Sequence, residues 1–406
     1  MSLKNAGIPV ESLDSNTPPA LKKMITADLR CGHPRIKLLY VTPEHCRLDY
    51  FRKLLRLVNE QRELARIAID EAHCISEWGH DFRPAFLGLS FFKEEFPNVP
   101  MICCTATATA QVRQDVIQTL NLDPARLQVF TMTSSRPNLH FEVRFQSHED
   151  NPFLDFIQWI RAIHERRKAA ARAAQLNSVK ERVSNVSGII YIHSRKDCEY
   201  LAEKLCEAGI GAKPYHAKLT RADKDDHLKG WVENREGYDV IVATTAFGMG
   251  IDKEDVRFVV HWVMPKSFEG FYQEAGRAGR DGKASACILY YSRKDRDWIR
   301  SIMAQDLQNP KKKATPGAIP NAQARSRSFE ALVNYCESTR KCRHEIIANF
   351  FDDKSAASCD WACDWHKDPQ KLKKDKTDIL DSEEWCQTQI EQGAYDEMQE
   401  DYMTID

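Results

Sequence analysis

The sequence lacks an apolar run of the roughly 18 residues that a membrane-spanning helix needs, and residues 1–10 lack the apolar stretch of a secretory signal peptide. It also lacks a repeat with a period of about 20–50 residues, which argues against a solenoid or propeller. From these absences we expect a soluble intracellular protein that does not act on a membrane.

Net charge is almost absent as well, because 58 Lys and Arg residues face 59 Asp and Glu residues. The balance is uneven along the chain. From Asp378 to the C-terminus there are ten acids and no Lys or Arg, which leaves 49 acidic against 58 basic residues on residues 1–377. A basic body with an acidic tail favours an anionic partner.

Cysteine is not scarce, but the 13 cysteines stand in a long chain without an export signal, so we expect reduced thiols, some of them on a metal. The 406 residues exceed what one core usually serves. With 42% hydrophobic and 29% charged residues, the composition is that of a globular protein of two or three domains.

Short apolar runs alternate with helical periodicity in two sets, which predicts an α/β protein with two lobes. Strands are expected at 36–41, 67–69 and 101–104, and again at 188–194, 239–245, 256–262 and 286–291. We assign an incomplete lobe one to 1–140 and lobe two to 141–300. A helical insertion at 162–187, a linker at 301–328, a helical segment at 329–370 and a disordered acidic tail at 371–406 complete the division. The insertion is either a solvated helix or a basic tether for nucleic acid.

The sequence RIAIDEAH at 66–73 ends a predicted strand in two adjacent acids. The carboxyl end of a parallel strand borders the crevice where α/β sheets bind ligands. Asp70 can hold Mg²⁺ through water while Glu71 aligns and deprotonates an attacking water, as phosphoryl transfer requires. The alternative is an acid pair that caps the following helix.

Further motifs accompany the acids in a fixed order. TATAT at 105–109 follows the next strand, DVIVATTAFGMGID at 239–252 ends in a Gly-rich turn, and QEAGRAGRD occupies 273–281. Gln273, Arg277 and Arg280 are spaced to lie along one helix face and its end. Arginine neutralises charge that develops on a transferred phosphoryl group.

In this order the motifs resemble a superfamily-two helicase. CISEWGHDFRPAF at 74–86 resembles the aromatic-rich loop of RecQ-family DNA helicases, and TPE at 42–44 and FYQEAGRAGRDG at 271–282 fit that family too. The resemblance spans nearly all of residues 1–370 and is nearest to the RecQ-five-like branch. Glu77 departs from the family, which usually has Gln there.

The resemblance implies two RecA-like lobes, ATP and Mg²⁺ as cofactors, and 3′→5′ translocation on DNA. Single-stranded, fork or junction DNA would be the partner, with a role in repair or recombination in the nucleus. The residues implied in catalysis are Asp70, Glu71, Gln273, Arg277 and Arg280. Those implied in cofactor binding are Asp70, His73, Gly250 and Asp252. Those implied in DNA binding and coupling are Trp78, His80, Asp81, Phe82, Arg83, Thr105 and Thr107.

The aromatic loop also has a physical rationale of its own. Unpaired bases stack on aromatic faces such as those of Trp78 and Phe82, while His80 and Arg83 can meet phosphate. The alternative buries both aromatic side chains in the core of the lobe.

A Cys/His cluster stands near the C-terminus, with Cys342, Cys359, Cys363 and His366 in the pattern C-x₁₆-C-x₃-C-x₂-H. Three thiolates and one imidazole suit a closed tetrahedral zinc site. RecQ proteins resemble this with four cysteines, so His366 stands in a Cys position. The alternative is a set of free buried thiols, with Cys336 as a competing ligand.

The sequence has no G-x-x-x-x-G-K-[ST] phosphate loop, whose backbone and Lys would cradle the β- and γ-phosphates. We therefore expect the chain to begin inside lobe one, either as a fragment of a complete helicase or as an ATPase-deficient DNA-binding or regulatory form. Two other interpretations stay open: a nucleic-acid-binding module without catalysis, and a zinc-dependent protein-interaction scaffold. The acidic tail either solvates the chain or docks a protein partner.

Overall fold

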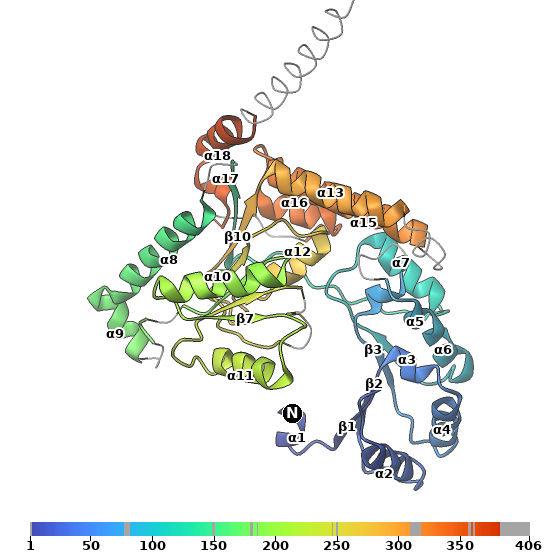
Figure 1. Cartoon of the computed structure of the whole chain (residues 1–406). Helices are drawn as coiled ribbons and strands as arrows, with labels where there is room; N and C mark the ends of the chain where they lie inside the picture. Colours follow the sequence, from blue (N-terminus) through green and yellow to red (C-terminus); the bar gives the residue numbers. More distant parts are fainter. Residues whose placement is uncertain are drawn as a thin grey trace, which may run out of the picture. The chain divides into compact units, whose positions relative to one another are not determined.

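A computed structural model describes residues 2–76, 82–147, 151–178, 182–184, 186–245, 247–248, 251–308, 318–355, 359 and 362–381 (Figure 1). The chain divides into two compact units. Unit 1 comprises Met1–Met132 with Asp306–Arg327, and unit 2 comprises Thr133–Gln305 with Ser328–Asp406. None of the helices in the described ranges is long and apolar enough to cross a membrane.

Unit 1 contains two pairs of parallel strands. β1 (Val10–Leu13) pairs with β2 (Leu38–Val41), and β3 (Ile67–Ile69) pairs with β4 (Met101–Cys103). The helical elements are α1 (Ser2–Asn5), α2 (Pro19–Leu29), α3 (Pro43–Cys46), α4 (Asp49–Glu60), η1 (Ala72–Ile75), α5 (Pro84–Leu87), η2 (Gly88–Ser90), α6 (Phe91–Glu95) and α7 (Ala110–Thr119).

Only one face of the unit 1 strands is covered by its helices. On β3, Ile67 and Ile69 are buried in the unit 1 core while Ala68 between them is exposed. On β2, Tyr40 is 56% exposed, and Ile102 on β4 is 42% exposed. Phe130, in the extended segment after α7, is 88% exposed. Unit 1 therefore presents apolar side chains on the second face of its strands.

Unit 2 is built on a six-stranded parallel sheet of order β5-β10-β9-β6-β8-β7. The strands are β5 (Leu139–Phe145), β6 (Gly188–Tyr191), β7 (Ala212–Tyr215), β8 (Val240–Ala243), β9 (Phe258–His261) and β10 (Ser285–Tyr291). All residues of β6, β8 and β9 are buried, as expected for parallel strands that helices cover on both faces.

The helices of unit 2 lie on the two faces of this sheet (Figure 1). They are α8 (Pro152–Lys168), α9 (Ala170–Ser178), α10 (Arg195–Glu207), α11 (Arg221–Val232), α12 (Phe268–Ala275), α13 (Arg293–Gln308), α15 (Ala318–Glu337), α16 (Arg343–Phe350), α17 (Asp364–Lys367), α18 (Pro369–Asp375) and the π-helix η3 (Lys376–Asp381). Of α13 and α15, the residues within Asp306–Arg327 belong to unit 1. Many of these helices begin at a residue whose side chain accepts a backbone N–H, as Ser194 does for α10 and Thr220 for α11.

The structure differs from the sequence-based expectations at several places. β1, β5 and β7 were not predicted, and helix was expected without a break over 329–351, where α15 and α16 are separate. Helix α15 occupies the second half of the predicted linker, and α18 and η3 continue the fold into the predicted tail as far as Asp381. Helix α13 covers residues 301–308 of the same predicted linker, while residues 309–317 and 382–406 lie outside the described residues.

A buried ion pair fastens the C-terminal segment to the edge strand β5. Arg343 is fully buried and its Nε and Nη2 donate to the two carboxylate oxygens of Asp364 at 2.8 and 2.9 Å. The same carboxylate accepts the backbone N–H of Val143 on β5 at 3.0 Å. One residue pair therefore satisfies a buried guanidinium and an outward-facing N–H of the sheet edge.

We expect Asp364→Ala to lower the free energy of unfolding of unit 2 by about 3–5 kcal/mol, because it leaves the Arg343 charge buried and unpaired. Urea denaturation followed by circular dichroism measures this loss. The exposed pair of Arg235 and Asp226 is the control, and Asp226→Ala should cost much less, because water solvates both of these charges. Equal losses in the two variants would contradict the prediction.

Candidate functional site

The predicted acid pair lies where β3 ends, beside the end of its partner strand β4. The Cys104 N–H donates to the Ile69 carbonyl at 2.8 Å, and the Ala72 N–H donates to the Cys104 carbonyl at 2.9 Å. These two bonds extend the ladder past the strands. They hold the residues after Ile69 next to Thr105, which begins the predicted TATAT motif.

Glu71 adopts a strained backbone conformation with φ of 50°, in the left-handed region that non-glycine residues rarely occupy. Its N–H donates to the Asp70 carboxylate at 2.9 Å. Although Glu71 stands at the N-cap of η1, its side chain makes no capping hydrogen bond, and Asp70 is exposed. The capping interpretation of the acid pair therefore finds no support.

His73 connects the acids to the threonine motif. Its buried Nδ1 lies 3.0 Å from the Thr105 hydroxyl and 3.3 Å from a carboxylate oxygen of Glu71. Thr105 in turn accepts the N–H of Thr107 at 3.3 Å. Thr107 is buried, and its hydroxyl has no hydrogen-bond partner among the described residues. Asp70, Glu71, His73, Thr105 and Thr107 are thus brought together.

The aromatic loop is described only at its two ends. Trp78, His80 and Asp81, like Glu77, lie outside the described residues. The Ser76 hydroxyl bonds to Asp115 on α7 before the loop, and the Arg83 N–H donates to the Cys74 carbonyl at 3.0 Å after it. Phe82 and Arg83 are half-buried. Both ends of the loop are therefore anchored close to the acid pair.

The arginine motif lies in unit 2, at the end of α12. Arg280 is partly exposed, and its Nη1 donates to the Ile251 carbonyl and to the Asp252 carboxylate, both at 3.1 Å. Gly250, in the same Gly-rich turn, lies outside the described residues, and Gln273 is half-buried on α12. Asp252 therefore forms an ion pair with Arg280 and orients its side chain.

Arg277 has a different environment from Arg280. It is only 7% exposed, and its Nε has no hydrogen-bond partner among the described residues. Burial raises the pKa of the neighbouring Tyr191 phenol, and the charge of Arg277 opposes that rise. Tyr191 stays protonated and donates to the Phe247 carbonyl at 2.9 Å, which fixes the segment leading to the Gly-rich turn.

The Cys/His cluster contains the three predicted cysteines and a histidine that was not predicted. The thiols of Cys342, Cys359 and Cys363 and one ring nitrogen of His344 lie within 4.8 Å of one another, and all four residues are buried. His366 is half-buried, with its Nδ1 3.4 Å from the Cys363 sulfur, and does not belong to this group. Cys336 is buried elsewhere in the core.

The cluster fits a tetrahedral zinc ion. Two thiolates bound at ~2.3 Å with tetrahedral angles lie ~3.8 Å apart, and the Cys342 and Cys363 sulfurs are separated by 3.8 Å. His344 Nε2 lies 3.3 Å from the Arg136 carbonyl, while its buried Nδ1 has no hydrogen-bond partner among the described residues. A zinc-bound imidazole commonly has this arrangement, in which the second ring nitrogen donates to a carbonyl.

The His344 signal was present in the sequence, as the second residue after Cys342. It was missed because the C-x₁₆-C-x₃-C-x₂-H spacing already offered a fourth ligand in His366. The paired residues Arg343 and Asp364, each directly following a cysteine, were missed as well, since a charged residue next to a cysteine has no distinctive pattern.

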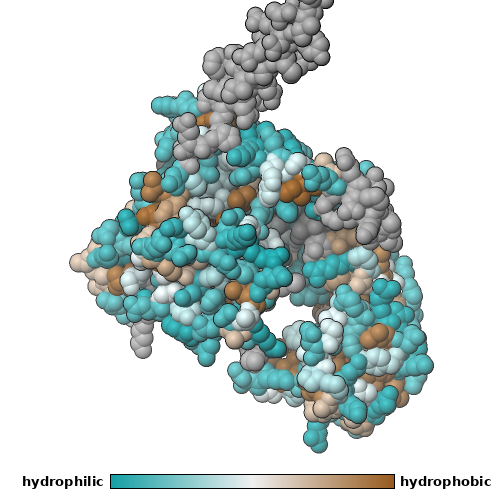
Figure 2. Space-filling model, viewed as in Figure 1, coloured by the Kyte–Doolittle hydropathy of each residue, from teal (hydrophilic) through white to brown (hydrophobic). Residues whose placement is uncertain are grey.

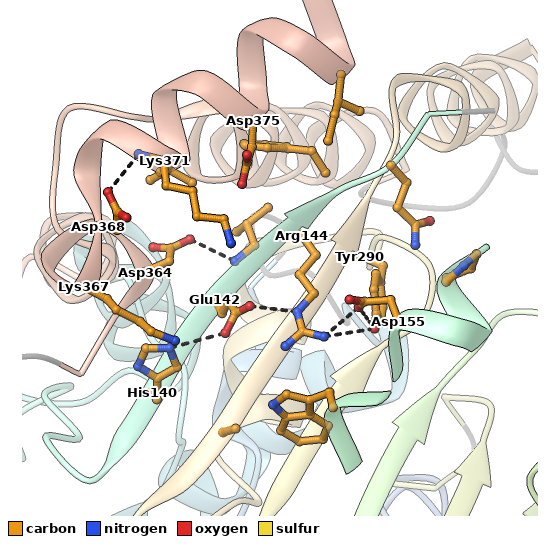
Figure 3. Close-up of a pocket in the computed structure, with 18 of the residues that line it drawn as sticks. His140, Glu142, Arg144, Asp155, Tyr290, Asp364, Lys367, Asp368, Lys371 and Asp375 are labelled. Atoms are coloured by element: carbon orange, nitrogen blue, oxygen red, sulfur yellow. Dashed lines mark hydrogen bonds and ion pairs between the residues drawn. The ribbon is translucent and has the colours of Figure 1, made fainter. Parts of the chain in front are cut away.

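A separate cavity of about 870 Å³ lies between β5, α8 and the α17–α18 segment (Figure 3). On one wall, Arg144 donates to Glu142 and to Asp155, both at 2.7 Å, and the Tyr290 hydroxyl donates to Asp155 at 2.6 Å. Lys367 and Lys371 come from the opposite wall. None of the predicted site residues that the structure describes lines this cavity.

Parts of this chain match known families. Residues 160–282 match the helicase conserved C-terminal domain, and residues 293–367 match the RecQ zinc-binding region. The crystal structure of DUF1998 helicase MrfA bound to DNA superposes on 73% of this chain and 38% of its own, with a TM-score of 0.53 and 18% identity, which shows the fold alone. Fold and families define a superfamily-two helicase with RecA-like lobes.

Named relatives identify the family within this superfamily. ATP-dependent DNA helicase Q5 of Mus musculus is 39% identical over 94% of this chain and 37% of its own length. ATP-dependent DNA helicase Q1 of Pongo abelii is 37% identical over 90% and 50%, and ATP-dependent helicase SGS1 of Saccharomyces cerevisiae is 34% identical over 85% and 22%. The chain belongs to the RecQ family, and it spans half or less of the length of these relatives.

The ion pairs beside the cavity predict acid sensitivity. Burial by itself would raise the pKa of Glu142, but hydrogen bonds from His140 and Arg144 and the Arg144 charge outweigh it and lower that pKa to about 2. The carboxylate of an unfolded chain titrates near ~4.3. The contribution of the ionised Glu142 to the free energy of unfolding is therefore complete above that pH and is lost as the pH falls towards 2.

We expect wild-type unit 2 to lose about 1–2 kcal/mol more than Glu142→Gln between pH 5 and pH 3. Urea denaturation at both pH values measures the difference. Glu207→Gln, which removes an exposed carboxylate paired with Lys204, is the control and should follow the wild type. A Glu142→Gln variant with the wild-type pH dependence would contradict the assignment.

Proposed function

We propose that this chain forms the core of a RecQ-like helicase that couples ATP hydrolysis to 3′→5′ translocation on single-stranded DNA and to unwinding of forks or junctions. The observation that carries the proposal is the acid pair at the end of β3, whose Glu71 makes no capping bond and contacts His73. The relatives named as ATP-dependent DNA helicases support it. A nuclear role in DNA repair or recombination is part of the same proposal.

In this proposal Asp70 holds Mg²⁺ through water, and the ion would neutralise charge on the phosphates. Glu71 aligns the attacking water and accepts its proton, and its carboxylate lies 3.3 Å from Nδ1 of His73. A change in the position of Glu71 would move His73, which contacts it. His73 is hydrogen-bonded to Thr105, and Thr105 to Thr107, so both threonines would respond. Bases of single-stranded DNA would stack on Trp78 and Phe82 in the aromatic loop. Because the ends of the loop are anchored close to the acid pair, DNA binding would affect the same residues.

The two arginines take different roles. Arg280 is partly exposed and held by Asp252, so we propose that it neutralises the charge that develops on the γ-phosphate. Arg277 is buried beside Tyr191, so we propose that it stabilises the Gly-rich turn. Gln273, one helical turn earlier, would contact the γ-phosphate.

The second candidate is an ATPase-deficient DNA-binding form, and the observation that favours it is the missing G-x-x-x-x-G-K-[ST] motif. In nucleotide-binding proteins with that motif, the loop supplies the backbone cradle and the lysine that hold the β- and γ-phosphates. The two candidates share the DNA-binding loop and differ only in turnover.

We expect DNA-stimulated ATP hydrolysis by the chain to fall about 100-fold or more in Glu71→Gln, because proton transfer from water is lost. Binding of labelled single-stranded DNA should not change in this variant and should weaken with salt. Glu63→Gln, elsewhere in unit 1, is the control. No turnover by the wild type, with DNA binding that Trp78→Ala weakens, would overturn the catalytic proposal in favour of the ATPase-deficient form.

We further propose that Cys342, Cys359, Cys363 and His344 bind one structural zinc ion, which would lock the C-terminal helices onto the sheet. The Cys342 and Cys363 sulfurs are separated by 3.8 Å, a distance at which both can bind the same ion. His344 takes the place that the sequence spacing gave to His366, because its unpartnered nitrogen belongs to the cluster.

We expect His344→Ala to weaken zinc binding by at least about tenfold, whereas His366→Ala keeps one zinc ion per chain at wild-type affinity. Competition with a chromophoric chelator measures the affinity, and elemental analysis measures the stoichiometry. Zinc loss in His366→Ala together with full retention in His344→Ala would restore the ligand set predicted from the sequence.

A further inference from the structure

The segment of residues 133–138, with the sequence TSSRPN, connects unit 1 to unit 2 along the chain and contacts two functional elements at once. We infer that this connector segment positions the arginine motif and makes its geometry depend on the zinc cluster. Arg136 and Asn138 are the positioning residues. The inference rests on the zinc site proposed above, whose occupancy is measured separately by elemental analysis, whereas the contacts of the connector are those of the structure.

On the zinc side, the connector is held by residues of α16 and of the turn that follows it. The Asp353 carboxylate accepts from the Thr133 hydroxyl at 2.9 Å, and from the hydroxyl and N–H of Ser134 at 2.8 and 2.6 Å. These bonds lower the pKa of Asp353, after the larger contribution of the Ser355 hydroxyl. Nε2 of His344 lies 3.3 Å from the Arg136 carbonyl, while its Nδ1 has no hydrogen-bond partner among the described residues.

On the other side, Arg136 binds the carbonyls that surround the two motif arginines. Its Nη2 donates to Ala278 and Gly279, both at 3.0 Å, and its Nη1 donates to Gly276 at 3.4 Å. Carbonyls at the end of a helix such as α12 lack partners within the helix, and a cation there is favoured by the helix dipole. One guanidinium therefore fixes the backbone between Arg277 and Arg280.

Asn138 fixes the same turn from its other end. Its amide donates to the Gly279 carbonyl at 2.8 Å and to the Lys283 carbonyl at 3.0 Å. Gly279 has a φ of 55°, and a Cβ built on it would lie 2.5 Å from the Asn138 amide nitrogen. A close approach of this kind needs glycine, because no side chain fits between the turn and the connector.

The two sets of contacts join in one residue, Arg136. Its carbonyl faces the imidazole of the zinc cluster, and its side chain holds the turn of the arginine motif. Loss of zinc would free His344, and the connector would then be held by Asp353 and by the Tyr272 hydroxyl, which donates to the Ser134 carbonyl at 3.0 Å. The turn would consequently open more often, and Arg280 would lose its fixed orientation.

Hydrogen–deuterium exchange of the full chain, read by mass spectrometry on peptides covering 276–283, tests this inference. The Gly279 and Asp281 amides donate to the Val256 and Glu254 carbonyls, so they report opening of the turn. We expect Arg136→Gln to speed exchange there about tenfold, since charge-assisted hydrogen bonds are lost. Arg136→Lys should recover part of the protection, and Arg235→Gln, on the unit 2 surface, should change nothing.

The effect of zinc removal on exchange at 276–283 distinguishes positioning by the connector segment from a local packing defect. Chelation should speed exchange at 276–283 in the wild type and add little in Arg136→Gln, because the link is already broken. Asn138→Ala provides a milder second variant should Arg136→Gln fail to fold. Unchanged exchange at 276–283 in folded variants, or equal effects of chelation in wild type and Arg136→Gln, would overturn the inference. Neither readout needs ATP turnover, so failure of the proposed function is detected separately.

Discussion

The buried pair of Arg343 and Asp364 is the interaction on which the C-terminal part of the structure depends. A guanidinium with no exposed surface is stable only when its charge is matched, and Asp364 matches it with two hydrogen bonds. Because Cys342 and Cys363 directly precede the two residues, the pair also brings the thiols to 3.8 Å. Asp364 then satisfies Val143, which ties the cluster to the edge strand β5.

The chemistry-bearing residues follow the carboxyl ends of parallel strands in both units. In unit 1 the ladder beyond β3 and β4 places the acid pair against Thr105, at the cost of a strained Glu71. In unit 2 the Gly-rich turn after β8 orients Arg280 through Asp252. The Cys/His cluster and the turn that carries the arginines both contact Arg136, the first through its carbonyl and the second through its guanidinium.

Much of the fold could be predicted, because strands buried on both faces are written as continuous apolar runs. β6, β8 and β9 are of this kind. β5 was missed because LHFEVRF alternates between buried and half-buried residues, and its polar side chains are satisfied only by tertiary partners such as Arg144 with Asp155. β7 was missed because AKPY carries proline and lysine and pairs at the sheet edge.

The α/β class, the order of the motifs, the acid pair and the three cysteines could be read from the sequence, since they follow from local periodicity and residue type. The grouping of His344 with the thiols, the burial of Arg277 and the contact of Arg280 with Asp252 became visible in the folded chain. Spacing along a chain fixes how many bonds separate two side chains. It does not fix the direction in which each points, which depends on the neighbours that packing supplies.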